Sequence, residues 1–258
     1  MSDSVPFDRA VEYYDRTRGL SEEASREMTA LLLDELTGRG RCLEVGVGTG
    51  LVSLPLAAAG LPMFGLDLSA PMLAKLVEKA GGHPPFPLVR GDATKLPFAE
   101  GRFGGAVLRH VLHLVSDWRG VIAELVRVTQ AGGIVLFARG EIPPAWREAT
   151  DRFRTLVGEP SIARGLDTWD PTTVDEAFED HGARARFLPV VAARVPQSLG
   201  TFLEQMADGL HSWTWDVDEP TRRKAAAEVR AWALERFGTL DPPEARDVAI
   251  EWRAYDLS

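Results

Sequence analysis

The segment that most constrains this chain is a glycine-rich turn that follows a short apolar run. An acidic residue precedes three glycines spaced at every second position, namely Glu44, Gly46, Gly48 and Gly50. The apolar pattern around the turn predicts a buried strand over 41–46 and a helix over 50–59. Glycines between a strand and a helix let the backbone turn tightly and approach a ligand with no side chain in the way. The helix start adds unpaired N–H groups and the positive end of a helix dipole, so the turn predicts a ligand site.

Asp67 ends the next apolar run, roughly 20 residues beyond the turn. A carboxylate at that place can accept hydrogen bonds from both hydroxyls of a ribose, so the turn and Asp67 together predict an adenosine-type cofactor. The dinucleotide pattern G-x-G-x-x-G would need its third glycine where this chain has Leu51. A nicotinamide-dependent oxidoreductase is therefore an alternative that shares the turn and Asp67 but leaves Glu44 unexplained.

Strands and helices alternate from residue 41 to residue 138. The other predicted elements of this region are strands over 62–67, 86–90, 103–109 and 133–138, and helices over 70–80 and 117–129. Ser69 and Asp117 are the predicted N-caps of those two helices. Alternation of this kind indicates an α/β fold with a parallel sheet and helices on both faces. The ligand of such a sheet belongs at the carboxyl ends of its strands, where the turn, Asp67, Asp92 and Arg109 fall.

Composition narrows the class of protein. With 258 residues, of which 45% are hydrophobic, the chain can bury one large core and a small second lobe. The single cysteine, Cys42, excludes an internal disulfide and a cysteine zinc cluster, and we expect no metal site. The net charge of −9 argues against nucleic acid as a partner. The sequence has no run of 18 apolar residues and no charged-then-apolar leader, so we expect no membrane span and a cytoplasmic protein.

Five segments, in order, resemble the motifs of the class I S-adenosylmethionine-dependent methyltransferases. They are residues 43–50, 64–69, 91–98, 103–110 and 130–137. The resemblance is specific over about 41–139 and closest to the small-molecule branch (methyltransferase type 11) that includes the ubiquinone/menaquinone-type enzymes. It implies a doubly wound, Rossmann-like sheet of seven strands, mostly parallel, with the last strand antiparallel. It also implies S-adenosyl-L-methionine as the cofactor, S-adenosyl-L-homocysteine as its product and a small-molecule methyl acceptor.

The resemblance carries roles over to individual residues. The three glycines of the turn would let the backbone reach the methionine and ribose parts of the cofactor, and Glu44 would hold the turn or bind the amino group through water. Asp67 would take the ribose hydroxyls. The residues implied at the adenine, or lining the cofactor, are Leu68, Met72, Asp92, Ala93 and Arg109. Simpler interpretations are a helix cap for Asp67, a turn residue for Asp92 and core packing for Met72.

The resemblance weakens at both ends of the chain. Residues 1–38 are predicted to form a helical cover, in which Tyr14 and Arg18 resemble groups that close on the cofactor's methionine carboxylate in some relatives; a solvated helix end is the alternative. Residues 39–196 and 238–258 would form the core, and 197–237 an inserted helical lid. Further predicted elements are helices over 7–15, 171–181, 198–209 and 220–237 and a sixth strand over 183–195. In the lid, His211, Trp213 and Trp215 would cover an apolar acceptor from an extended segment, or simply pack together.

His110 and His113 follow the fourth predicted strand and are the candidate general bases. They lie three residues apart, on what the spacing predicts to be one helical turn. A histidine titrates in the useful pH range and can take a proton from an oxygen or nitrogen acceptor. The alternative is that His113 packs beneath the strand and that His110 lines the cofactor.

The predicted function is methyl transfer from S-adenosylmethionine to a small, partly apolar acceptor, at oxygen or nitrogen rather than carbon, by a monomer or homodimer. A protein of the same fold that binds the cofactor without methylating is the main alternative. A nucleic-acid methyltransferase would need a basic face or a dedicated catalytic sequence such as Asn-Pro-Pro-Tyr, whereas residues 109–112 are Arg-His-Val-Leu.

Overall fold

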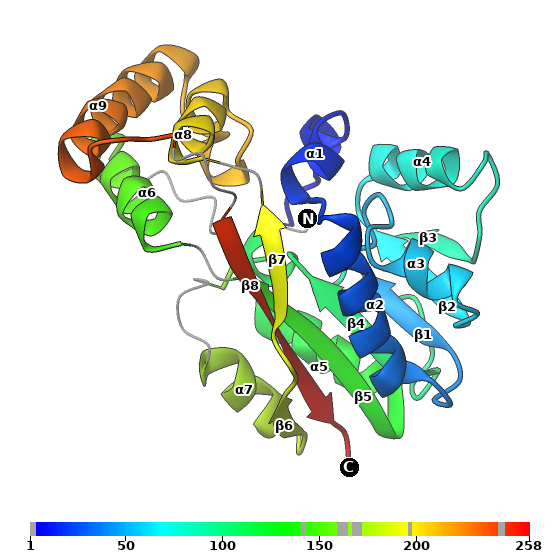
Figure 1. The fold of residues 1–258 in the computed structure, drawn as a ribbon. Coiled ribbons are helices and arrows are strands. Elements are labelled where there is room, and N and C mark those ends of the chain that lie inside the picture. The colour runs from blue at the N-terminus through cyan, green and yellow to red at the C-terminus, as the bar shows by residue number, and fades with distance from the viewer. Residues whose placement is uncertain (1–3, 141–142, 159–164, 167–171, 196–197, 242–245) are drawn as a thin grey trace. The chain divides into compact units, whose positions relative to one another are not determined.

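The computed structural model describes residues 4–258 apart from 141–142, 159–164, 167–171, 196–197 and 242–245 (Figure 1). The chain divides into two compact units. The first comprises 1–139, 164–191 and 250–258, and the second comprises 140–163 and 192–249. The second unit thus contains the segment predicted as an insertion, 197–237, together with residues on both sides of it. Each unit has an apolar core of its own.

One sheet of eight strands has the order β3-β2-β1-β4-β5-β8-β6, with β7 also paired to β8. Its strands are β1 (Cys42–Val45), β2 (Met63–Asp67), β3 (Leu88–Arg90), β4 (Phe103–Arg109), β5 (Thr129–Gly140), β6 (Arg184–Phe187), β7 (Val191–Val195) and β8 (Arg246–Asp256). The strands β1 to β5 pair in parallel, whereas β8 runs antiparallel to β6. The predicted doubly wound α/β fold, with an antiparallel last strand, is confirmed.

The sheet has eight strands rather than seven because the predicted sixth strand, 183–195, is interrupted. The strand β6 ends at Phe187 and β7 begins at Val191, with Pro189 between them. A proline has no N–H to donate to a neighbouring strand, so regular pairing breaks around it. Both pieces nevertheless pair with β8.

Helices cover both faces of the sheet in the first unit. Successive side chains of a strand point to opposite faces. Cys42 and its partner Gly105 face the helix α2 (Glu22–Leu36), because a Cβ built on Gly105 would lie 2.5 Å from Leu36 Cδ2. Leu43 and Val45, on the other face of the same strand, belong to the large apolar core. A parallel sheet of this kind is buried on both faces.

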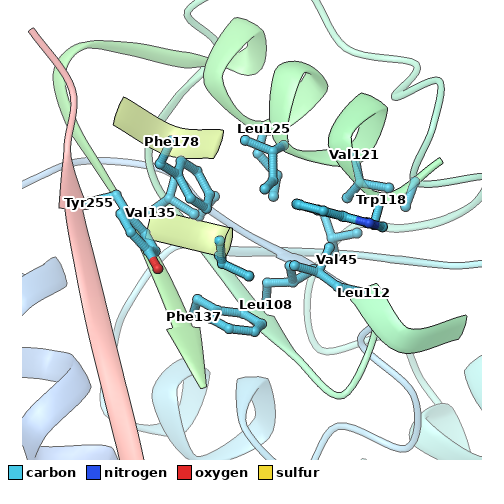
Figure 2. Close-up of a cluster of buried hydrophobic side chains, with 14 of the residues drawn as sticks. Val45, Leu108, Leu112, Trp118, Val121, Leu125, Val135, Phe137, Phe178 and Tyr255 are labelled. Carbon is cyan, nitrogen blue, oxygen red and sulfur yellow. The ribbon is translucent and has the colours of Figure 1, made fainter. Parts of the chain in front are cut away.

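The larger core lies between the sheet and the helices α5 (Trp118–Val128) and α7 (Thr172–Glu179). Figure 2 shows Val121 and Leu125 of α5 directed toward sheet residues that include Val135. Phe178 of α7 stacks on Tyr255 of β8, with ring centroids 3.9 Å apart. Each fully buried side chain of this size contributes about 1.5–3 kcal/mol to stability. The loops at the strand ends are therefore mounted on a rigid base.

Two predicted helix starts are confirmed by their caps. Ser69 Oγ accepts a hydrogen bond from Met72 N (3.2 Å) at the start of α4 (Ala70–Lys79). Asp117 Oδ1 accepts one from Gly120 N (2.9 Å) at the start of α5. Such caps satisfy backbone donors that have no partner within the helix.

Two other predicted helices are wrong in extent. The helix predicted over 7–15 is replaced by a 3₁₀ turn, η1 (Asp8–Ala10), and a separate α1 (Tyr14–Arg18), which Asp15 ties down through contacts with Thr49 and Lys79. The helix predicted over 50–59 is the shorter α3 (Ser53–Ala58). The residues before it stay in turns because the glycines there adopt positive φ angles.

The second unit is mainly helical. It contains α6 (Pro144–Leu156), α8 (Leu199–Asp208), the 3₁₀ turn η3 (Ser212–Thr214) and α9 (Glu219–Phe237). Trp146 of α6 stacks on Phe202 of α8, with ring centroids 4.6 Å apart. The helices predicted over 198–209 and 220–237 are thus present. Nowhere in the described part of the chain is a helix long and apolar enough to cross a membrane.

Candidate functional site

The glycine turn is fixed to the end of β2. Gly46 N and Val47 N both donate to Leu66 O, at 2.8 and 3.0 Å. Gly46, Gly48 and Gly50 have φ angles of 72, 52 and 82°, which residues other than glycine rarely adopt. A Cβ on Gly46 would lie 2.2 Å from Val111 Cγ2, so this position is also closed sterically. At Gly48 the nearest side-chain atom to such a Cβ is in the Tyr14 ring, at 3.8 Å.

Asp67, the last residue of β2, holds the turn through its carboxylate. Asp67 Oδ2 accepts from Gly48 N and Oδ1 accepts from Ser69 N, each at 2.8 Å. Burial raises the pKa of Asp67, and these backbone hydrogen bonds oppose that rise. Asp67 does not cap α4 itself, because Ser69 Oγ fills that role. Its place at the carboxyl end of β2, against the turn, is the one the sequence predicts.

Glu44 is a buried carboxyl with an unmet requirement. Its side chain belongs to a residue only 3% exposed, and Oε2 has no hydrogen-bond partner among the described residues. Burial raises the pKa of Glu44 to about 8, although the neighbouring Ser53 and Arg109 oppose the rise. A buried carboxyl in this state is poised to pair with a cation that enters from outside.

A small cavity opens at the ends of β1 and β4. It is lined by Tyr14, Glu44, Gly46, Val47, Leu51, Val52 and Arg109. The strands β1 and β4 flank the point where the strand order reverses, which is where open α/β sheets bind ligands. Val47, Leu51 and Val52 were not among the predicted site residues; their position inside the turn was the signal available for them.

One guanidinium group, that of Arg109, lines the cavity, and the charge of a second, Arg18, acts on it. Arg109 makes no hydrogen bond or ion pair with the described residues, and the Arg18 guanidinium donates only to the adjacent Thr17 O (3.1 Å) within that part of the chain. Burial lowers the pKa of both, and the charges of Arg18 and Arg109 act on each other. Tyr14 lies near both arginines, and burial raises its pKa. The arrangement presents unpaired positive charge beside the unpaired oxygen of Glu44.

The N-terminal segment contacts the site at several points. Ser4 Oγ donates to Asp92 Oδ1 (3.3 Å), and Val5 N donates to Leu114 O (3.3 Å). Further along, Asp15 accepts from Thr49 in the turn and pairs with Lys79 of α4 at 2.6 Å. The segment therefore lies against the loops after β1, β3 and β4.

The residues predicted for the adenine lie on the β2 and β3 side of the turn. Met72 is 1% exposed within α4, as core packing requires, whereas Leu68 is half-buried. Asp92 Oδ1 accepts hydrogen bonds from Thr94 N (2.9 Å) and Thr94 Oγ1 (2.8 Å), so Asp92 also closes a tight turn. Ala93 beside it is buried.

His110 and His113 do not share one helical turn as predicted. His110 has a φ of 60°, the one positive value at a non-glycine residue in the described segments, and the 3₁₀ helix η2 (Leu112–Leu114) starts only after it. A left-handed residue at a strand end ends the strand sharply, and such conformations gather at functional sites. Burial lowers the pKa of His110 well below its ordinary value and that of His113 to about 4, with Arg18 contributing to both. Both imidazoles are therefore neutral at pH 7.

The aromatic group of the second unit packs internally. Residues 212–214 form η3, so the extended arrangement predicted for Trp213 and Trp215 is wrong. Trp213 stacks on His211 with centroids 5.3 Å apart, and Trp215 Nε1 donates to Gly209 O (3.0 Å).

Cys42 is buried, and burial raises its pKa to about 12, so it behaves as a small apolar residue. No cluster of metal-binding side chains occurs among the residues that the structure describes.

Comparison with known sequences decides the family. A demethylmenaquinone methyltransferase of Streptomyces avermitilis is 34% identical over 170 residues, which cover 62% of this chain and 70% of that protein. A phosphatidylethanolamine N-methyltransferase of Cereibacter sphaeroides is 37% identical over 153 residues, 56% of this chain and 74% of that protein. The profile described as "Methyltransferase domain" matches residues 43–137. The chain belongs to the class I S-adenosylmethionine-dependent methyltransferases, in their quinone-type branch.

Solved structures show the same methyltransferase fold. The YcgJ protein of Bacillus subtilis has a TM-score of 0.62 at 17% identity, over 91% of this chain and 98% of that one. Phosphoethanolamine N-methyltransferase 2 of Haemonchus contortus, solved with S-adenosylhomocysteine, has a TM-score of 0.56 at 16% identity, over 97% of this chain and 57% of that one.

The residues of this methyltransferase fit the family's cofactor chemically. S-adenosylmethionine carries an ammonium, a carboxylate and two ribose hydroxyls. The cavity offers a carboxyl with an unpaired oxygen, Glu44, and an unpaired guanidinium, Arg109, among the described residues. Asp67 lies at the adjoining strand end, where its carboxylate oxygens accept hydrogen bonds.

Proposed function

We propose that this methyltransferase binds S-adenosylmethionine in the cavity at the ends of β1 and β4 and transfers its methyl group to a small, partly apolar acceptor. The observation that carries the proposal is that one cavity is lined by two polar groups with unused hydrogen-bonding capacity among the described residues, Oε2 of the Glu44 carboxyl and the Arg109 guanidinium. A ligand with an ammonium and a carboxylate on the same carbon, as in an amino acid, meets both. The dinucleotides NAD and NADP have no such pair.

The bound cofactor supplies a methyl group already activated by its sulfonium. The chain's own residues then have three tasks: to hold the ligand, to keep water out and to place the acceptor in line. The three glycines of the turn leave its backbone accessible, and Asp67 would exchange its bond with Gly48 N for ribose hydroxyls. Asp92 and Ala93 would recognise the adenine edge, with Leu68 and Met72 beside the ring. Tyr14 and Arg18 would cover the methionine carboxylate.

The acceptor atom is proposed to be oxygen or nitrogen. These atoms often carry a proton that must be removed, and His110 is a neutral imidazole at the end of β4, next to the cavity-lining Arg109. His113 is the second candidate for that role. The relatives named for a quinone and for a phospholipid support an acceptor with an apolar part.

Two segments are proposed to exclude water from the reaction: the N-terminal cover, 1–38, and the helical segment 197–237. The hydrogen bonds of Ser4 with Asp92 and of Asp15 with Thr49 support the first of them. Segments that close over a site are usually among the less stable parts of a fold.

Calorimetric titration tests the proposal. S-adenosylmethionine and S-adenosylhomocysteine should bind, and NAD and NADP should bind far more weakly. A screen for methyl transfer to small metabolites then tests turnover. Tight NAD binding with no response to S-adenosylmethionine would overturn the proposal. Binding of S-adenosylmethionine without transfer to any acceptor would instead favour a protein that uses the cofactor structurally.

A further inference from the structure

The helix α5 carries an ion pair, Arg127 with Glu124, that is joined by two short hydrogen bonds. Arg127 Nε donates to Glu124 Oε1 at 2.7 Å, and Arg127 Nη2 donates to Glu124 Oε2 at 2.8 Å. The two side chains are 36% and 20% exposed, respectively. Each side chain stabilises the charged form of the other, since Arg127 lowers the pKa of Glu124 and Glu124 raises the pKa of Arg127. The pair is therefore a fixed, bidentate unit.

The remaining hydrogen-bonding capacity of this pair goes to the main chain of the loop between β3 and β4. Leu96 N donates to Glu124 Oε2 at 2.7 Å. In return, Arg127 donates to Leu96 O at 3.0 Å and to Phe98 O at 2.8 Å. Because these hydrogen bonds go to backbone atoms, they fix the path of the loop main chain itself. Residues 96–98 are thus clamped to α5.

Asp92 is held between this clamp and the sheet. On one side Gly91 N donates to Asp67 O (3.0 Å), at the end of β2. On the other, Lys95 N donates to Asp92 O (3.1 Å), and the adjacent Leu96 is both clamped and buried. Only three residues separate Asp92 from Leu96. A displacement of the clamped end must therefore move the Asp92 carboxylate and Ala93.

We propose that Glu124 and Arg127 are positioning residues that set Asp92 and Ala93 and thereby the preference of the site for the 6-amino edge of adenine. This inference rests on the proposed function, in which Asp92 faces that edge. Neither residue of the pair is among those that line the cavity. Their effect passes through the loop backbone to Asp92.

The test compares two ligands and two ion pairs. Kd values are measured by calorimetry for S-adenosylhomocysteine and for S-inosylhomocysteine, in which a carbonyl replaces the 6-amino group. The variants are Arg127→Lys, Glu124→Gln and Asp92→Asn. The matched control is Glu78→Gln, because Lys75 and Glu78 on α4 form another i,i+3 pair at 2.8 Å whose carboxylate is more exposed and which makes no hydrogen bond to a loop backbone in the described part of the chain.

The expected result is a change in preference rather than in affinity alone. A lysine keeps the charge, but its single nitrogen has three donors and cannot replace the four hydrogen bonds that Arg127 makes from three nitrogens. Arg127→Lys should therefore reduce the preference for the adenine ligand by about tenfold, the loss expected when one hydrogen bond to a charged acceptor is misplaced. Glu124→Gln should act in the same direction, Asp92→Asn should remove the preference, and Glu78→Gln should leave it at the wild-type value.

The outcomes separate this inference from the proposed function. If the wild-type protein binds neither ligand, the proposed function fails and the positioning role fails with it. If the wild type prefers adenine and both clamp variants keep that preference while binding both ligands equally less tightly, the pair is merely structural. Thermal unfolding of each variant identifies any that fails to fold, in which case the other clamp variant decides.

Discussion

The ends of β1 and β2 carry acidic side chains, whereas the end of β4 carries basic ones. On the first side, burial raises the pKa of the carboxyls of Glu44 and Asp67. On the second, burial lowers the pKa of Arg109 and His110. Each side is shifted toward its uncharged form because neither finds enough opposite charge within the protein.

The two sides differ in how their polar atoms are held. Asp67 already accepts two backbone hydrogen bonds, whereas Glu44 Oε2 and the Arg109 guanidinium have no hydrogen-bond partner among the described residues. Unpaired buried polar groups cost stability, and sites keep them where a ligand supplies the missing partner. Under the proposed function, Asp67 would shape the site before the cofactor binds, and Glu44 and Arg109 would gain their partners from the cofactor.

The largest expected effect comes from removing the segment that spans both sides. Deletion of residues 1–19 should abolish turnover, because Tyr14 is lost from the cavity and Arg18 from beside Arg109, while the sheet stays folded on its own core. Turnover and circular dichroism measure the two parts. In the intact protein, hydrogen exchange over 4–19 and 198–237 should slow when S-adenosylhomocysteine is added. Full activity of the shortened protein, with unchanged exchange in the intact one, would exclude a covering role.

The next largest effect tests only the basic side, at the end of β4. His110→Ala should lower kcat by about 10²–10⁴, the usual contribution of a positioned base, with little change in cofactor affinity. Because the pKa of His110 lies well below 6.5, the wild-type rate should rise with pH only in the acid range and be level at neutral pH. Steady-state kinetics over pH measures both.

The exposed His83 provides the control for that substitution. His83→Ala should leave kcat and the pH profile unchanged. If His110→Ala retains most of its kcat on the true acceptor, His110 is not the base, and the acceptor is one for which placement is sufficient. That result would leave methyl transfer itself intact.

The acidic side is tested by Asp67→Ala. This substitution should weaken the binding of S-adenosylmethionine by about 1.5–3 kcal/mol, because hydrogen bonds to a charged acceptor are lost, on the order of 10–100-fold in Kd. Calorimetry measures the affinity. An unchanged Kd would show that the ribose hydroxyls are bound elsewhere.

The sequence predicted the local structure of the acidic side better than that of the basic side. The reason is the separation along the chain of the residues that determine each. The glycine turn and Asp67 belong to one strand-turn-helix-strand unit, so local pattern fixes their relation. The left-handed backbone of His110 has no such signal, since histidine is an ordinary strand or helix residue. The bonds from α5 to the β3–β4 loop join residues 28 and 31 positions apart, which no local pattern reveals.

Fold class followed from alternation, whereas the element limits depended on single residues. Pro189 splits the sixth strand, and its missing N–H was visible in the sequence. The N-terminal helix is shorter than predicted because Asp15 bonds across the fold to Thr49 and Lys79 instead of extending a regular helix. Tertiary contacts overrode the local helical spacing there.

The smallest effect concerns the pH dependence of cofactor binding through Glu44. With a pKa of about 8, Glu44 holds its proton at pH 7 in the free protein. An ammonium bound beside it would favour the carboxylate, so binding at pH 7 must release a proton. Affinity for S-adenosylhomocysteine should therefore rise with pH, by up to about tenfold for each unit below 8, and level off above. Calorimetry in buffers of different protonation enthalpy counts the proton.

Glu44→Gln isolates this effect because glutamine keeps the shape of the side chain and removes its titration. The variant should release no proton on binding through this group, and the slope of affinity against pH below 8 should disappear. Glu78 is more exposed, and Glu78→Gln should keep the wild-type slope of affinity against pH. That result would exclude a general effect of removing one negative charge. A slope that survives in Glu44→Gln would assign the proton to another group on the acidic side, of which Asp67 is the one whose pKa is also raised. Glu44 would then be a structural support for the turn rather than a partner of the ligand's ammonium.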